Sequence, residues 1–134
     1  MPITVNWSDD TKRIMIWKYH ATWTLEEFHD AIEQAGLLGS QITHFYVSIV
    51  DYSDTLTPAH KVLSAASTSR SNMSDNLVAI INVKPNMLFS LLMKAFNRFV
   101  PQHVQVVEEQ SLDDAFIKAE SLLTSAEMGE RDAD

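Results

Sequence analysis

Apolar and polar residues alternate near the beginning of the chain. Residues 3–7 follow this alternation, with apolar side chains at the odd positions. In a second short stretch, Ile14 and Ile16 alternate with Met15 and Trp17. A period of two is typical of β-strands with two different faces. The polar stretch Ser8–Lys12 between them is rich in turn-forming residues. The pattern therefore predicts an antiparallel hairpin.

A helical period replaces the alternation after Trp23. Thr24 and Glu27 have the spacing of a capping box, in which each side chain accepts a hydrogen bond from the other residue's backbone. Trp23 and Phe28 stand at the positions of a hydrophobic staple around this box. Gly36 can supply the left-handed residue that ends a helix. We expect a helix that begins after Thr24 and ends at Gly36.

Two continuous apolar runs follow, at residues 44–50 and 77–83. Such runs, rich in β-branched residues, are typical of parallel strands covered on both faces. The first run is expected to end at Asp51, before a polar loop. Thr57 and the proline after it predict the start of a second helix, and residues 87–100 predict a third.

The remaining pattern predicts one more strand and one more helix. Val104, Val106 and Val107 form the strand, and Ser111–Asp114 has the residues of a capping box that opens the helix. Beyond Thr124 the chain is acidic and nearly devoid of bulky apolar residues. We expect residues 124–134 to form a disordered tail.

Strands and helices thus alternate after an initial hairpin. This order predicts an α/β fold, with a mixed, mostly parallel sheet of about five strands, an N-terminal antiparallel hairpin and four helices. Residues 1–123 would form this domain, with Ile49, Val50, Ile80 and Ile81 in the core.

Over residues 3–123 this order resembles the STAS fold of bacterial sporulation anti-sigma-factor antagonists. The local resemblance lies in Val50-Asp51-Tyr52-Ser53, similar to the family's strand followed by Asp-x-Ser, and in Ser111-Leu112-Asp113-Asp114-Ala115-Phe116, similar to the opening of its last helix. In the family, a partner kinase phosphorylates a Ser or Thr at the N-terminal end of the second helix. The matching stretch here is 54–59, Asp-Thr-Leu-Thr-Pro-Ala, without the family's double Ser and Gly.

Composition narrows the classes of function. The chain has 134 residues, 10 Lys and Arg against 18 Asp and Glu, and a formal net charge of -8. This charge argues against a protein that binds duplex nucleic acid. With 0 Cys, a disulfide framework and a thiol nucleophile are excluded. We expect a cytoplasmic protein with no transmembrane segment, because no apolar run is long enough to span a bilayer.

Polar residues collect after the apolar run that ends at Val50. A ligand or partner can bind at the carboxyl ends of parallel strands, and a hydroxyl at a helix N-terminus is suited to accept a phosphate. A capping and turn-forming role explains the same residues without any function. The candidates for a partner-binding or phosphoacceptor loop are Asp51, Ser53, Asp54, Thr55, Thr57 and His60.

Catalysis and metal binding have less support in the pattern. Ser53, His60 and Asp51 are the residue types of a hydrolytic triad, but the Gly-x-Ser-x-Gly elbow is absent. His29 and Glu33 have the spacing of two metal ligands on one helix, without a second ligand pair. We therefore predict no catalytic residues, no bound metal and no cofactor.

The segment 87–100 has an apolar arc wider than one core face. Phe89 and Met93 widen this arc, and Lys94 and Arg98 lie close to it. No Asp or Glu occurs from Asn76 through Val107. Deeper burial explains the pattern, and so does a homodimer, another protein partner or contact with a membrane surface.

The sequence favours a non-catalytic regulatory or protein-interaction domain that presents the 51–60 loop to a protein partner. A module that binds a small molecule or lipid is the alternative, with an apolar pocket near Trp17 and Tyr19. These rings and Ile14 and Ile16 would make both faces of one strand apolar, so each face needs a cover. A small hydrolase ranks third.

Overall fold

The computed structural model describes residues 3–21, 23–55, 75–83, 101 and 103–133. In chain order the elements are β1 (Ile3–Trp7), β2 (Ile14–Ala21), α1 (Leu25–Ser40), β3 (Tyr46–Thr55), β4 (Leu77–Val83), β5 (Gln105–Glu109) and α4 (Leu112–Ala133). The second and third helices predicted from sequence fall on residues 57–70 and 87–100, outside the described residues. The structure therefore supports two of the four predicted helices.

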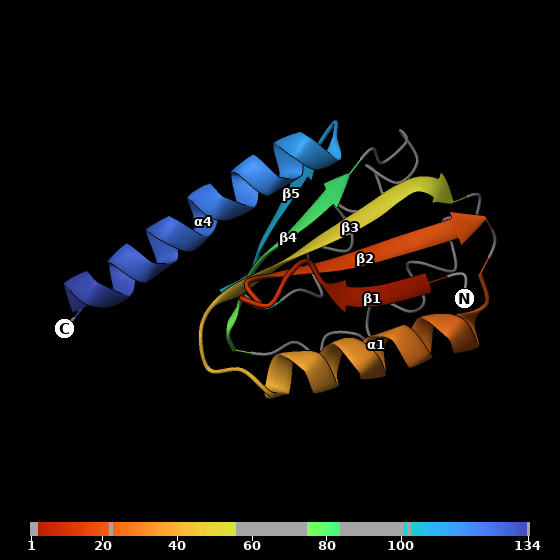
Figure 1. The fold of residues 1–134 in the computed structure, drawn as a ribbon, viewed down its shortest axis with the longest axis horizontal. Helices are drawn as coiled ribbons and strands as arrows, with labels where there is room; N and C mark the ends of the chain where they lie inside the picture. The colour runs from red at the N-terminus through yellow and green to blue at the C-terminus, as the bar shows by residue number, and fades with distance from the viewer. Residues whose placement is uncertain (1–2, 22, 56–74, 84–100, 102, 134) are drawn as a thin grey trace.

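The five strands form one mixed sheet in the order β1-β2-β3-β4-β5. β1 pairs with β2 in antiparallel fashion, and the pairs β2–β3, β3–β4 and β4–β5 are parallel. Figure 1 shows the strands side by side, with α1 next to β1 and α4 near β4 and β5. The predicted hairpin and the mostly parallel sheet are confirmed.

A polar turn shapes the hairpin between β1 and β2. The Asp9 carboxylate accepts hydrogen bonds from the backbone and the hydroxyl of Thr11. Both bonds favour the charged carboxylate and hold the pKa of Asp9 below the ordinary value of 3.8. Lys12 then adopts a left-handed backbone with φ 55°. This local geometry returns the chain in register with β1.

The capping box at the start of α1 is present as predicted. The Glu27 N–H donates to the Thr24 hydroxyl at 3.1 Å, and the Thr24 N–H donates to the Glu27 carboxylate at 3.0 Å. Trp23 and Phe28 complete the staple with ring centroids 5.4 Å apart. The predicted end at Gly36 is wrong, because the helix runs to Ser40 and no glycine among the described residues has a positive φ.

Helix α4 begins as predicted and ends later. The Ser111 hydroxyl accepts a hydrogen bond from the Asp114 N–H at 3.1 Å. The helix continues to Ala133, through most of the segment assigned from sequence to a disordered tail. Arg13, just before β2, donates to Glu120 and to Glu127 of α4, each at 3.0 Å. The ion pair with Glu127 connects the part of the helix beyond Thr124 to the hairpin.

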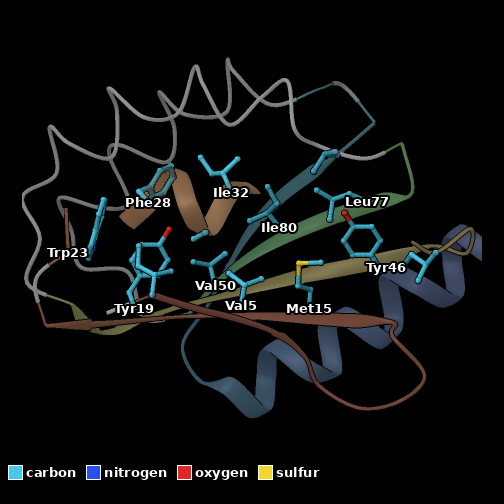
Figure 2. Close-up of a cluster of buried hydrophobic side chains, with 14 residues drawn as sticks. Val5, Met15, Tyr19, Trp23, Phe28, Ile32, Tyr46, Val50, Leu77 and Ile80 are labelled. Carbon is cyan, nitrogen blue, oxygen red and sulfur yellow. The ribbon is translucent and has the colours of Figure 1, made fainter. Parts of the chain in front are cut away.

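The sheet buries apolar side chains on both faces. The α1-side core, drawn in Figure 2 between the sheet and α1, contains Ile3, Val5, Met15, Tyr19, Trp23, Phe28, Ala31, Ile32, Ile42, Tyr46, Val50, Leu77, Ile80 and Val104. The α4-side core contains Ile14, Val47, Ile49, Ala79, Ile81, Val83, Ala115, Ala119 and Leu123. The four predicted core residues of β3 and β4 are all buried. Both faces of β2 are covered, as its apolar residues required.

Candidate functional site

Asp51 lies within the central strand β3, at the last position that pairs with the described part of β4. Its backbone neighbours in the sheet are Lys18 on β2 and Val83 on β4. Its relative exposure is 8%, which makes it one of three buried polar or charged residues among the described residues. A carboxylate in this position is costly to bury unless other groups compensate for it. Strand alternation places it on the same face as Val47 and Ile49, and Lys18 follows Ile14 and Ile16 on that face of β2.

The strand β3 continues beyond Asp51, so the predicted strand end is wrong. Residues 54 and 55 still pair with His20 and Ala21 of β2, after a bulge that inserts one extra residue into β3. The physical reason is the length of β2, which reaches Ala21 and keeps a backbone partner available to β3. Strand pairing depends on hydrogen bonds between backbone groups, so the polar side chains after Asp51 do not end the strand.

The predicted loop residues therefore divide into two groups. Asp51, Ser53, Asp54 and Thr55 lie together on β3, and of the last three the structure describes the backbone alone. Thr57 and His60 lie outside the described residues. The pairing of β3 with β4 ends at Asp51 and Val83. Residues 52–55 thus extend past the described end of β4 at the carboxyl edge of the sheet.

Asn82 is a buried polar residue of β4 that the sequence pattern did not single out. This residue is 1% exposed, and among the described residues neither its side-chain nitrogen nor its side-chain oxygen has a hydrogen-bond partner. Alternation along β4 places Asn82 on the face of Ile80, opposite Ile81 and Val83. The signal in the sequence was a single amide within the apolar run 77–83. Buried polar groups normally have partners, so Asn82 is a candidate polar contact for a bound molecule.

Asn82 belongs to a row of neighbouring residues that crosses all five strands of the sheet. Register pairs Val5 with Trp17, Trp17 with Val50, Val50 with Asn82, and Asn82 with Glu108. The row is apolar over β1, β2 and β3 and becomes polar over β4 and β5. The carboxyl half of the α1-side face therefore contains an amide and a carboxylate on neighbouring strands.

The aromatic residues of the hairpin mainly build the core. Tyr19 contacts Trp23 edge-on at 5.3 Å between ring centroids, and Trp17 stacks on Tyr19 at 6.5 Å. Phe28 of α1 packs against the rings of all three. This cluster fixes α1 on the sheet. The apolar pocket expected near Trp17 and Tyr19 stays a prediction.

Histidines and carboxylates of the described residues do not form a metal site. Within those residues, no group of three or more such side chains is close enough to hold a metal ion. His29 lies against Phe28, with ring centroids 6.5 Å apart. His44 pairs with the backbone oxygen of Lys12 at 2.9 Å.

The predicted dimer or partner surface lies outside the described residues. It comprises Phe89, Met93, Lys94 and Arg98. Among the helices that the structure describes, neither is long and apolar enough to cross a membrane.

Comparisons with known proteins give no family assignment. No family model matches the chain, and no curated protein matches it.

Proposed function

We propose that this chain is a non-catalytic, cytoplasmic regulatory domain of the bacterial STAS-like type. In this proposal it binds a protein partner through the segment that follows Val50. The supporting features are the mixed sheet with one antiparallel edge and the position of β3 at its centre. The proposed contact residues are Asp51, Ser53, Asp54, Thr55, Thr57 and His60.

The observation that carries the proposal is the continued pairing of β3 with β2 after Asp51. After Asp51 the described part of β4 has ended, while β2 still pairs with residues 54 and 55. The segment is therefore fixed along one side by the sheet. A fixed polar strand loses less conformational entropy on binding than a free loop.

A hydroxyl in this segment is the proposed site of regulation by phosphate. Ser53, Thr55 and Thr57 follow the buried carboxylate of Asp51 within a few residues. A phosphate adds about -1.5 to -2 charge at neutral pH. Beside Asp51 and Asp54 this charge would repel the neighbouring carboxylates. Phosphorylation would therefore change the electrostatic surface that the partner recognises.

Two substitutions test the proposal. Ser53→Ala and Thr55→Ala each remove one hydroxyl, and Thr124→Ala removes an exposed hydroxyl on α4 as a matched control. We expect the first two variants to lose a protein that wild type and Thr124→Ala both capture from native bacterial lysate. We also expect a phosphopeptide that covers residues 51–60. Unchanged capture by both variants, together with no such phosphopeptide, would contradict the proposal.

Self-association through the segment 87–100 is part of the same proposal. It rests on the sequence pattern of Phe89, Met93, Lys94 and Arg98, with acidic groups of α1 as complementary charges. Phe89→Glu should convert a dimer into a folded monomer in sedimentation velocity. A monomeric wild type at high concentration, or a Phe89→Glu variant that unfolds, would contradict this contact.

A small-molecule-binding module is the second candidate, and the buried amide of Asn82 favours it. An amide offers one donor group and one acceptor within an otherwise apolar strand. Such a group would orient a ligand that is mostly apolar and has one polar end. Native mass spectrometry of the purified chain should then show a retained molecule that Asn82→Leu loses. If the wild-type protein has the mass of the chain alone, with no bound molecule, this second candidate function is rejected.

A further inference from the structure

The outer edge of β1 is one of the two edges of the sheet, and its backbone groups can be assigned a direction. Ser8 donates its N–H to the Ile14 oxygen at 2.8 Å, so the backbone of Ser8 faces β2. Alternation in an antiparallel pair then turns Thr4 and Asn6 toward β2 as well. The backbone groups of Ile3, Val5 and Trp7 consequently point away from the sheet.

Those outward groups match the requirements for pairing with a second copy of β1. The strand has 5 residues with Val5 at its centre. In a twofold antiparallel pair, Val5 would face Val5 of the second copy, and Ile3 would face Trp7. An edge strand with uncovered backbone groups is a template for sheet extension. Ile3 and Val5 are 4% and 1% exposed, so this edge is covered within the fold.

Helix α1 contributes the group that occupies this edge. The Gln34 side chain donates a hydrogen bond from Nε2 to the Val5 backbone oxygen at 2.9 Å. Figure 1 shows α1 running alongside β1, and Gln34 is an exposed residue of this helix. The bond uses the central outward acceptor of the strand, so a second strand could not pair there without breaking it.

We propose that the hydrogen bond of Gln34 to Val5 prevents the β1 edge from pairing with the β1 strand of a second copy. The opposite edge differs from β1 because β5 ends in the carboxylates of Glu108 and Glu109, and charged residues on an edge strand oppose sheet extension. The role of Gln34 is independent of the proposed partner segment, which lies on the central strand. It is also independent of the proposed contact through Phe89.

Gln34→Met tests this role, because methionine has a similar length and helix propensity but no hydrogen-bond donor in its side chain. The matched control is Gln41→Met, which changes an exposed glutamine at the end of the same helix. In sedimentation velocity we expect Gln34→Met to form a species of twice the wild-type mass. Gln41→Met should retain the wild-type mass.

A rescue variant identifies the edge as the contact. Asn6 is exposed on β1, and a lysine on an edge strand opposes sheet extension. Asn6→Lys combined with Gln34→Met should therefore restore the wild-type mass. The proposal is overturned if Gln34→Met keeps the wild-type mass, if Gln41→Met also doubles, or if Asn6→Lys fails to reverse the doubling.

A measurement on the wild-type chain covers the case in which Gln34→Met does not fold. The side-chain amide protons of Gln34 should exchange with solvent more slowly than those of Gln41 in NMR spectra, because one of them is bonded to Val5. Equal exchange rates would overturn the proposal.

Discussion

Ile80 shows what a single residue of β4 contributes to stability. Its side chain lies in the α1-side core and is buried. Ile80→Ala should lower the free energy of unfolding by about 2 to 5 kcal/mol, because it removes buried methyl groups and leaves a cavity. Chemical denaturation measures this change. The control is Ile117→Ala on α4, where the side chain is 71% exposed and the loss should stay below about 0.5 kcal/mol.

Two asparagines at the residue scale should respond in opposite directions. Asn82 is buried and has no hydrogen-bond partner within the described part of the chain, whereas Asn76 donates to the Ile42 oxygen at 2.9 Å. Asn82→Leu should raise the free energy of unfolding by about 1 to 3 kcal/mol, since it removes two unpaired polar groups. Asn76→Leu should lower it in the same denaturation experiment. Destabilisation by Asn82→Leu would indicate that the amide supports the fold.

At the scale of elements, the turn between β1 and β2 should respond to pH. The pKa of Asp9 is lowered by its hydrogen bonds to Thr11, so the folded chain favours the charged carboxylate more than the unfolded chain does. This contribution to stability is present above the unfolded value of 3.8 and is lost as the pH falls through the lower folded value. Asp9→Ala should therefore be less stable than wild type at neutral pH.

Urea denaturation over a range of pH tests the direction of this pH dependence of stability. The stability difference between wild type and Asp9→Ala should disappear at pH values below the folded pKa. Asp10→Ala alters the exposed neighbouring aspartate and serves as the control. A difference that grows as the pH falls would contradict the role of Asp9.

The elements differ in how far local sequence determined them. The hairpin and the beginnings of α1 and α4 were predictable because turn and capping residues act on neighbours within a few positions. The ends of α1 and β3 were not. Gly36 is compatible with the interior of a helix, and the length of β3 depends on pairing with β2, which is distant along the chain.

At the scale of the whole molecule, the mostly parallel sheet with its antiparallel hairpin could be predicted, and the site only in part. Apolar runs at β3 and β4 indicated buried parallel strands, and both are covered on two faces. Asp51 was identified from its place after such a run. Asn82 was missed because a pattern of apolar residues does not reveal whether a polar neighbour finds a partner. The contact of Gln34 with β1 likewise arises from tertiary packing.

The arrangement of the molecule concentrates its candidate chemistry at the carboxyl edge of the sheet. The extended end of β3 and the buried amide of β4 both lie there. The aromatic cluster and the ion pairs of Arg13 hold the two helices on opposite faces of the sheet. We infer that the sheet rigidly supports the polar segment that follows Val50. This arrangement fits a segment that binds a partner better than it fits an irregular surface loop.

Site-directed photocrosslinking tests this account most directly. A photoreactive phenylalanine derivative is placed at Ser53 in one full-length variant and at exposed Thr124 of α4 in another, and the crosslinked proteins in bacterial cells are identified by mass spectrometry. The account predicts a defined heterologous protein crosslinked at residue 53 and absent at residue 124. The same proteins at both positions, or none at residue 53, would contradict it.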